Sequence, residues 1–182
     1  TISEKIILLD EGMKAALKEV TKPLAKESII HFQKGFGKEA FTDENGRRKK
    51  WKRRVYTVGY KNRKILTKTG RMKRAFSFKT SALKATVTNN AEYSGHHNEG
   101  AIQQITKKQL KYFMWRAQTA IREDDREFWE NMSRRKVGDT ITLPKRQFMG
   151  ESKPLVNKHK KTILRILKLN TKKSRVNSVV RV

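Results

Sequence analysis

Apolar residues recur every three or four positions at the start of the chain, as on one face of an amphipathic helix. This stripe predicts a helix over about residues 3–20 and consists of Ile6, Leu9, Met13, Leu17, Val20 and Leu24. Pro23 interrupts it, because proline lacks the N–H that a helix interior uses. Thr21 is a candidate cap for a second helix, which continues the apolar face and ends at Gly35 and Gly37. The pattern therefore predicts two N-terminal helices joined at a kink.

The next stretch is polar. Residues 36–50 contain glycines and the pair Asn45-Gly46, which is a strong turn signal. We expect an exposed loop here. Residues 55–60 then have the composition of a short strand, and residues 61–64 form a basic linker.

Apolar spacing changes again between residues 65 and 100. Gly70 sets a turn before a short segment in which apolar residues recur at helical spacing. Alternation of apolar and polar residues then predicts a β-hairpin, with a core built from Phe76, Phe78, Leu83, Ala85 and Val87. Asn89-Asn90 is a turn or cap, and residues 91–98 form a short helical segment.

A helical insertion is predicted at about residues 101–140. Thr106 and Gln109 have the spacing of a capping box, and one helical face follows with Leu110, Phe113, Met114, Ala117 and Ile121. Phe128, Trp129 and Met132 either continue this helix or form a second helix folded back on it. The aromatic content exceeds what a free helix needs, so we expect the insertion to pack against the body or against another protein.

After a turn at Gly138-Asp139 and a short strand over residues 140–143, the chain enters a final helix. Ser152 is its cap and Pro154 lies in its first turn; its apolar face consists of Leu155, His159, Ile163, Ile166 and Leu167. We expect residues 171–182 to be an extended tail that crosses a neighbour. The predicted fold is α+β, with one domain over residues 1–170 that has long N-terminal helices, a small antiparallel sheet and a basic C-terminal helix.

The charge of the chain indicates what kind of partner it would bind. The 182 residues carry a net charge of +27, and 34% of them are charged. Residues 1–44, 45–91, 92–142 and 143–182 carry −1, +16, +1 and +11 respectively. Two basic blocks of this kind favour a polyanion such as double-stranded DNA, or an acidic protein surface. The alternative is that the charge only keeps the unassembled protein in solution.

The first basic block includes RRKKWKRR, in which Trp51 is surrounded by Arg47, Arg48, Lys49, Lys50, Lys52, Arg53 and Arg54. These cations are candidates to face DNA or a protein partner, and the indole is a candidate to stack on a base. We favour a packed Trp51 over a stacking one. The chain has no cysteine, no apolar run near the roughly 20 residues that span a bilayer, and no signal-peptide pattern, so we expect no membrane association.

Catalytic and metal-binding groups are few. The adjacent His96 and His97 invite a metal site, or a nuclease in which His97 acts with Asp124 and Asp125, but no HExxH or HxxxH spacing supports either hypothesis. Arginines flank the acidic cluster of Asp124, Asp125 and Glu127, which is typical of a solvated or salt-bridged face. We expect no enzyme activity, no cofactor and no metal.

Three segments, which follow one another in the same order as in the family, resemble the phage Mu-like virion morphogenesis or tail-completion proteins. They are Thr69-Gly70-Arg71-Met72, the segment from Tyr93 to Gly100, and the segment from Pro144 to Gly150. Ser94 replaces the family's Ala, Gln147 its Pro, and Met72 and Met149 its Leu. The matching motif residues, to which the resemblance gives structural roles, are Gly70, Arg71, Tyr93, His97, Gly100, Phe148 and Gly150.

The resemblance implies a structural protein of a tailed-phage virion, assembled in the host cytoplasm. Its members form a ring at the head–tail junction, the neck, where they complete the tail beside portal-adaptor and other neck and tail proteins. It also implies that the three segments meet in one core, with Tyr93 and Phe148 near the hairpin. The basic blocks would then line the passage of packaged DNA. The alternative is a sequence-nonspecific nucleic-acid-binding protein, architectural or ribosome-associated, although the chain has no recognised readout motif.

Overall fold

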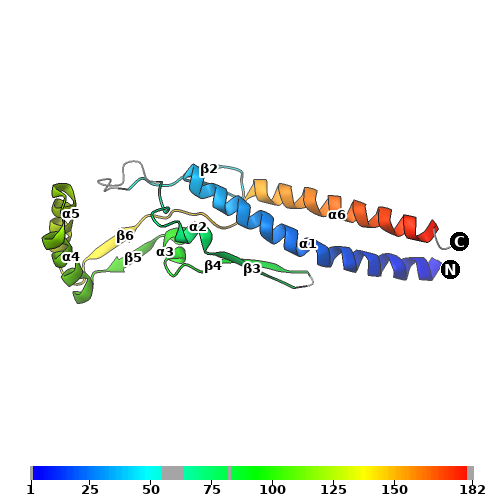
Figure 1. The fold of residues 1–182 in the computed structure, drawn as a ribbon, viewed down its shortest axis with the longest axis horizontal. Helices are drawn as coiled ribbons and strands as arrows, with labels where there is room; N and C mark the ends of the chain where they lie inside the picture. The colour runs from blue at the N-terminus through cyan, green and yellow to red at the C-terminus, as the bar shows by residue number, and fades with distance from the viewer. Residues whose placement is uncertain (1, 55–63, 82, 180–182) are drawn as a thin grey trace.

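The computed structural model describes residues 2–54, 64–81 and 83–179. The molecule is elongated, with both chain ends at one end and a pair of helices, α4 and α5, at the other (Figure 1). The fold is α+β, as predicted, but within these described ranges the strands form three separate two-stranded ribbons and not one small sheet. The strand expected at residues 55–60 and most of the linker after it lie outside the described residues.

One continuous helix, α1, runs from Ile2 to Lys38. The predicted break at Pro23 is therefore wrong. Proline in a helix interior costs about 3 kcal/mol, and the burial of Val20, Thr21 and Ala25 on either side of it offsets that cost. The helix also passes the predicted stop at Gly35 and Gly37, and it ends where Glu39 takes a left-handed φ of 49°.

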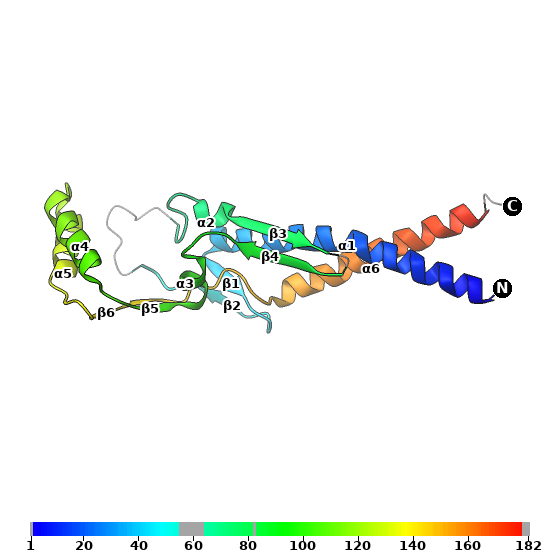
Figure 2. The ribbon, with the colours of Figure 1, turned by 90° about the horizontal axis from the view of Figure 1, so that it is seen from below.

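The last helix, α6, spans Lys153–Val179 and runs antiparallel to α1 along much of its length (Figures 1 and 2). Leu155 is buried in the helix pair, and the predicted apolar face is the face turned to α1. The extended tail expected from residue 171 is wrong as far as Val179, because the backbone there is helical. A helix that is already nucleated extends through weak helix formers without a second nucleation cost.

The region expected to be an exposed loop is a β-hairpin. Strand β1, Ala40–Thr42, pairs with β2, Arg48–Lys50. The turn signal itself is confirmed, since Gly46 has a φ of 81° and its N–H donates to the carbonyl of Asp43 at 3.0 Å. Pairing with a second strand satisfies the backbone groups that a loop would leave to water.

The hairpin predicted after Gly70 is present. Gly70 precedes the short helix α2, Arg71–Arg74, and strands β3, Phe76–Thr80, and β4, Ala85–Asn89, then pair antiparallel alongside α1. The proposed hairpin core is partly wrong. Phe76 packs on the body, but Leu83 is 73% exposed and Ala85 is exposed, because the tip of the hairpin extends past the residues that cover its base.

The insertion is a helical hairpin on a stalk. Helix α3, Ser94–Glu99, leads into β5, Ala101–Gln104, a strand that the pattern did not predict, and β5 pairs with β6, Thr140–Leu143. Between these strands lie α4, Lys107–Thr119, and α5, Glu123–Ser133. The capping box of Thr106 and Gln109 is confirmed, as is the folded-back second helix. Ile121, placed on the α4 face by its spacing, is 97% exposed because it follows the end of the helix.

Candidate functional site

Two of the three segments that carry the resemblance contribute a side chain to one aromatic core. Phe148 is fully buried, and its ring centroid lies 5.2 Å from that of Phe36 on α1 and 6.0 Å from that of Phe76 on β3. Met72, from the turn after Gly70, is 2% exposed in the same cluster. Aromatic pairs at these distances contribute beyond the area they bury, so the core links elements that are far apart in the sequence.

Hydrogen bonds tie the segment of residues 93–100 to that of residues 144–150. The Asn98 side-chain oxygen accepts from the backbone N–H groups of Phe148 and Met149, both at 3.0 Å. The backbone N–H of Arg146 donates to the carbonyl of His97 at 2.7 Å. An exposed ion pair of 3.3 Å joins Lys145 to Glu99. The first segment meets the third in the core, because Met72 and Phe148 belong to the same buried cluster.

Gly100 shows why this junction requires a glycine. Its φ is 80°, and a Cβ there would lie 3.1 Å from the Lys145 nitrogen and 3.2 Å from the Leu143 oxygen. Both contacts are to backbone, which cannot rotate away as a side chain does. The other motif residues lie nearer the surface: Arg71 is exposed, and Tyr93 is 37% exposed, with its ring edge-on to His97 and not in the core. Gly150, at a φ of 145°, is the last residue of the third segment and lies shortly before α6.

His97 occupies a structural position. Its Nδ1 is buried and has no hydrogen-bond partner among the described residues. The pKa of His97 lies below its ordinary value of 6.5, first because burial disfavours the imidazolium and then because the charges of Arg146 and His96 repel it. The neutral ring packs beside Arg146, whose Nε donates to the carbonyl of Lys52 at 3.1 Å.

The residues of the nuclease hypothesis are not brought together. His97 lies on α3 at the body, while Asp124 and Asp125 lie on α5 beyond the β5–β6 ribbon (Figure 1). Within residues 18–54, 64–81, 83–123 and 125–170, whose side chains are described, no group of three or more His, Asp or Glu has the geometry of a metal site. The geometry therefore offers no centre for that reaction.

Trp51 is part of the core. It is 6% exposed, its ring lies edge-on to Phe36 at 5.4 Å, and its Nε1 donates to the carbonyl of Gln147 at 2.6 Å. An indole that is buried and hydrogen-bonded in this way presents no face to a base. The packed Trp51 that the sequence favoured is the one observed.

The cations around Trp51 divide into two groups. Lys49 forms an ion pair of 3.0 Å with Asp43, whose side chain is buried and also accepts from the backbone N–H groups of Asn45 and Arg47. The Lys49 hydrogen bond is the main cause that holds the pKa of Asp43 below its ordinary value. Arg54 is half-buried and donates to the carbonyl of Lys64 at 2.9 Å. The remaining cations of this stretch are exposed, namely Arg47, Arg48, Lys50, Lys52 and Arg53.

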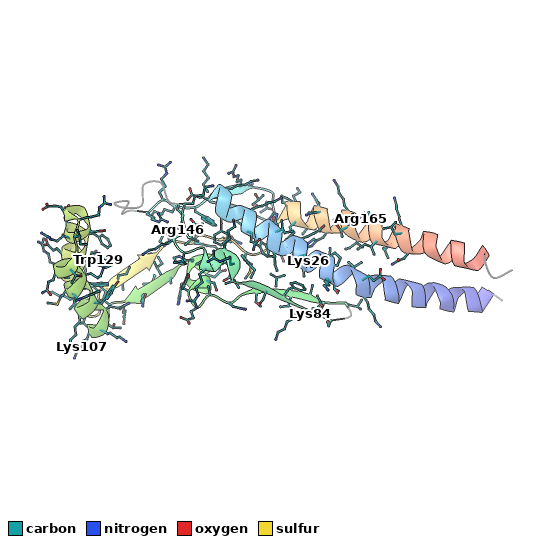
Figure 3. All side chains as sticks on the ribbon, in the orientation of Figure 1. Lys26, Lys84, Lys107, Trp129, Arg146 and Arg165 are labelled. Carbon is teal, nitrogen blue, oxygen red and sulfur yellow. The ribbon has the colours of Figure 1, made fainter. Side chains whose placement is uncertain are left out.

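The two basic blocks meet at the start of α6. The backbone N–H of Lys153 donates to the carbonyl of Asp43 at 3.0 Å, which places the β1–β2 turn against the first turn of α6. Exposed cations continue from there along α6, at Lys153, Lys158, Lys160, Lys161, Arg165 and Lys168. Figure 3 shows that cations also lie elsewhere along the molecule, from Lys107 on α4 to Arg165 on α6. We define the basic surface as the exposed cations of β2 and of residues 47–53 together with those of α6.

Sequence reasoning missed three residues that hold this region together. Asp43 organises the β1–β2 turn, and its place two residues before Asn45-Gly46 was an available signal for a side-chain-capped turn. Glu39 ends α1 and accepts from the backbone N–H of Ile65 through its side chain. Asn98 stands at a position where the motif accepts any residue, so no local sequence signal marks it.

No helix among the described residues is both long and apolar enough to span a bilayer. Comparisons of the chain with protein families, with curated proteins and with solved structures find no match. The functional argument therefore rests on the geometry above and on the resemblance of the three segments.

Proposed function

We propose that this protein is a structural component of a tailed-phage particle, in which copies of the chain form a ring at the head–tail junction and complete the neck or tail. The observation that supports this proposal is that the three resembling segments lie together. Met72 and Phe148 share one buried cluster, and the Asn98 side chain accepts from the backbone N–H of Phe148. The protein would assemble in the host cytoplasm with portal-adaptor and tail proteins as neighbours.

The surface suits an assembly role better than catalysis. Two buried charged groups of the body, Asp43 and Arg146, are used within the fold. Asp43 binds Lys49 and two backbone N–H groups, and Arg146 donates to the carbonyl of Lys52. The molecule is long and thin, with helices exposed at both ends (Figures 1 and 2). Such a shape exposes much surface for its mass, and this surface gains stability when neighbouring subunits cover it.

Negative-stain electron microscopy of the purified protein, with native mass measurement, tests the proposal. We expect closed rings of a single stoichiometry, since a heterologous contact whose rotation closes gives a ring. A protein that stays monomeric at all concentrations, or that forms only open filaments, would overturn the ring.

The basic surface supports a second role for the same ring, which is to screen the phosphates of DNA that passes through it. Arg47, Arg48 and Lys50 lie side by side on an exposed strand and turn, and no ion pair with a described residue occupies them. Lysines and arginines in this arrangement bind the phosphate backbone without reading the bases. A monomer that binds duplex DNA of any sequence would instead favour the alternative function, a sequence-nonspecific nucleic-acid-binding protein.

A further inference from the structure

Helices α4 and α5 form an arm that stands away from the body. They pack mainly on each other and are carried by the β5–β6 ribbon at the end opposite the chain termini (Figures 1 and 2). The arm has a small core of its own, in which Phe113 is buried and stacks on Trp129 at 5.9 Å, with the Arg116 guanidinium 5.3 Å from the same indole. The arm therefore holds its shape without support from the body, and the body covers little of it.

The outer face of α4 is apolar and basic. Trp115 is 53% exposed and Tyr112 is 48% exposed, although both are large aromatic residues. Lys108 and Lys111 lie two turns and one turn before Trp115 on the same side of the helix and are exposed, as is Lys107. We call these five residues the α4 outer face. Tryptophan and tyrosine are among the residue types that contribute most at protein interfaces, and the lysines beside them give this face its charge.

Helix α5 carries the opposite charge. It contains five acidic residues and one arginine, whereas α4 contains four basic residues and no acidic one. Glu123 and Glu127 are exposed, and Asp125 and Glu130 are half-buried. Lys107, Lys108 and Lys111 form no ion pair with a described residue. The described carboxylates of α5 therefore do not neutralise these three lysines within the same arm.

The charges decide which partner fits. A protein with a net charge of +27 repels its own copies over most of its surface, and α5 is an acidic element on which a basic face of another copy can dock. A nucleic acid fits the arm poorly, because a polyanion on α4 would meet the carboxylates of α5 on the same small unit. We propose that the α4 outer face of one copy binds α5 of a second copy of this chain.

This contact joins two different surfaces, so the first copy keeps a free α5 and the second copy keeps a free α4 for the next neighbours. Repeated contacts of this kind close into a ring when the rotation between copies permits it. The inference rests on the ring of the proposed function and assigns one of the contacts that would build it. It also identifies what covers Trp115 and Tyr112, which the body leaves open.

Two charge-reversal variants of the full-length chain test the contact. The first, Lys107→Glu/Lys108→Glu/Lys111→Glu, makes α4 acidic, and the second, Glu123→Lys/Glu127→Lys/Glu130→Lys, makes α5 basic. Each variant then repels its own copies, and we expect sedimentation and native mass to show a dissociation constant raised at least about a hundredfold. An equimolar mixture pairs an acidic α4 with a basic α5, and the wild-type α4 with the wild-type α5. We expect the mixture to assemble with an affinity within about tenfold of the wild type.

A matched control reverses three exposed lysines outside the arm, Lys73→Glu/Lys79→Glu/Lys84→Glu, and should assemble as the wild type does. Circular dichroism and thermal melting report whether each variant keeps its helices. A monomeric wild type, or arm variants that assemble like the wild type, would overturn the contact. So would two variants that stay monomeric when mixed, because that result indicates a different, anionic partner.

The same experiment separates this contact from the proposed function. If both arm variants still form closed rings, the ring of the proposed function is supported and the arm contact is rejected. Mixtures that recover assembly but form dimers or open chains would support the arm contact and contradict the ring.

Discussion

Asn98 shows how a single side chain can join two segments of a fold. Its oxygen accepts two backbone N–H groups that follow one another in the chain, those of Phe148 and Met149. Both donors belong to a segment without regular secondary structure, where no strand or helix supplies a partner. A backbone N–H that is buried without a partner costs free energy, so this carboxamide stabilises the segment at two successive residues.

We predict that Asn98→Ala lowers the free energy of unfolding by about 1–3 kcal/mol for each N–H group that it leaves buried and unpaired. Asn98→Asp keeps an oxygen acceptor and should lose less. Urea denaturation of the two variants, compared with the wild type, measures the difference. Equal stability of Asn98→Ala and the wild type would mean that water replaces the side chain at no cost.

Phe148 lies at the centre of the core, and we predict that Phe148→Ala costs about 3–5 kcal/mol of stability, because it creates a cavity between Phe36 and Phe76. Leu83 is the matched control. The sequence pattern places both residues in the same core, but Leu83 is 73% exposed, so Leu83→Ala should change stability by no more than about 0.5 kcal/mol. Thermal melting of both variants tests this contrast, and a similar loss in the two would contradict the observed packing.

At the scale of elements, the α1–α6 pair is held by polar contacts as well as apolar ones. Ser152 Oγ lies 3.0 Å from His31 Nε2, Ser28 Oγ lies 3.3 Å from His159 Nε2, and Thr162 donates to Glu27 at 2.8 Å. The pKa of His31 is lowered by burial and then by the His159 charge, with smaller contributions from Lys158, Lys38 and Lys34. Burial also lowers the pKa of His159, although Glu27 acts in the opposite direction.

We predict that acid destabilises the protein from below about pH 6.5, the ordinary pKa of histidine. A histidine whose pKa is lower in the folded state binds a proton more readily when unfolded, so stability is full above 6.5 and is lost as the pH falls toward the folded-state pKa. Melting temperatures measured between about pH 5 and pH 8 test the direction.

The double variant His31→Gln/His159→Gln should flatten this pH dependence. Some dependence should remain, because the pKa of His97 is lowered as well. If the melting temperature of the double variant depends on pH as strongly as that of the wild type, His31 and His159 do not cause the loss of stability in acid.

At the scale of the whole molecule, charge is the dominant property, and its effect depends on which cations are free. Lys49 holds the buried Asp43 and is needed for the fold of the β1–β2 turn, whereas Arg47, Arg48 and Lys50 are exposed on the same hairpin. A test of DNA binding should therefore leave Lys49 in place. It should also leave Trp51, because Trp51 is a core residue.

We predict that Arg47→Glu/Arg48→Glu/Lys50→Glu weakens the binding of duplex DNA equally for unrelated sequences. It should also reduce the slope of log affinity against log salt by about 0.9 for each phosphate that the variant no longer neutralises. The variant Lys73→Glu/Lys79→Glu/Lys84→Glu changes the net charge by the same amount and should have a smaller effect. If the first variant binds DNA normally but fails to join heads to tails, the basic surface serves an acidic protein partner.

The sequence alone determined the features that depend on neighbours a few residues away. The capping box of Thr106 and Gln109, the turn at Asn45-Gly46, the turn at Gly70 and the antiparallel hairpin after it were all readable, because caps, turns and short hairpins form from adjacent residues. The packed state of Trp51 was also favoured in advance and is observed.

The tertiary structure decided everything that depends on contacts between distant segments. Pro23 signals a break, yet α1 continues through it because the buried residues on either side contribute more than the lost backbone hydrogen bond costs. Leu83 fits the alternation of apolar and polar residues, yet its side chain is 73% exposed. Asn98 has no sequence pattern that marks it, yet its side chain joins two segments. Periodicity shows which face of an element is apolar, whereas only the packed chain shows which part of that face meets another element.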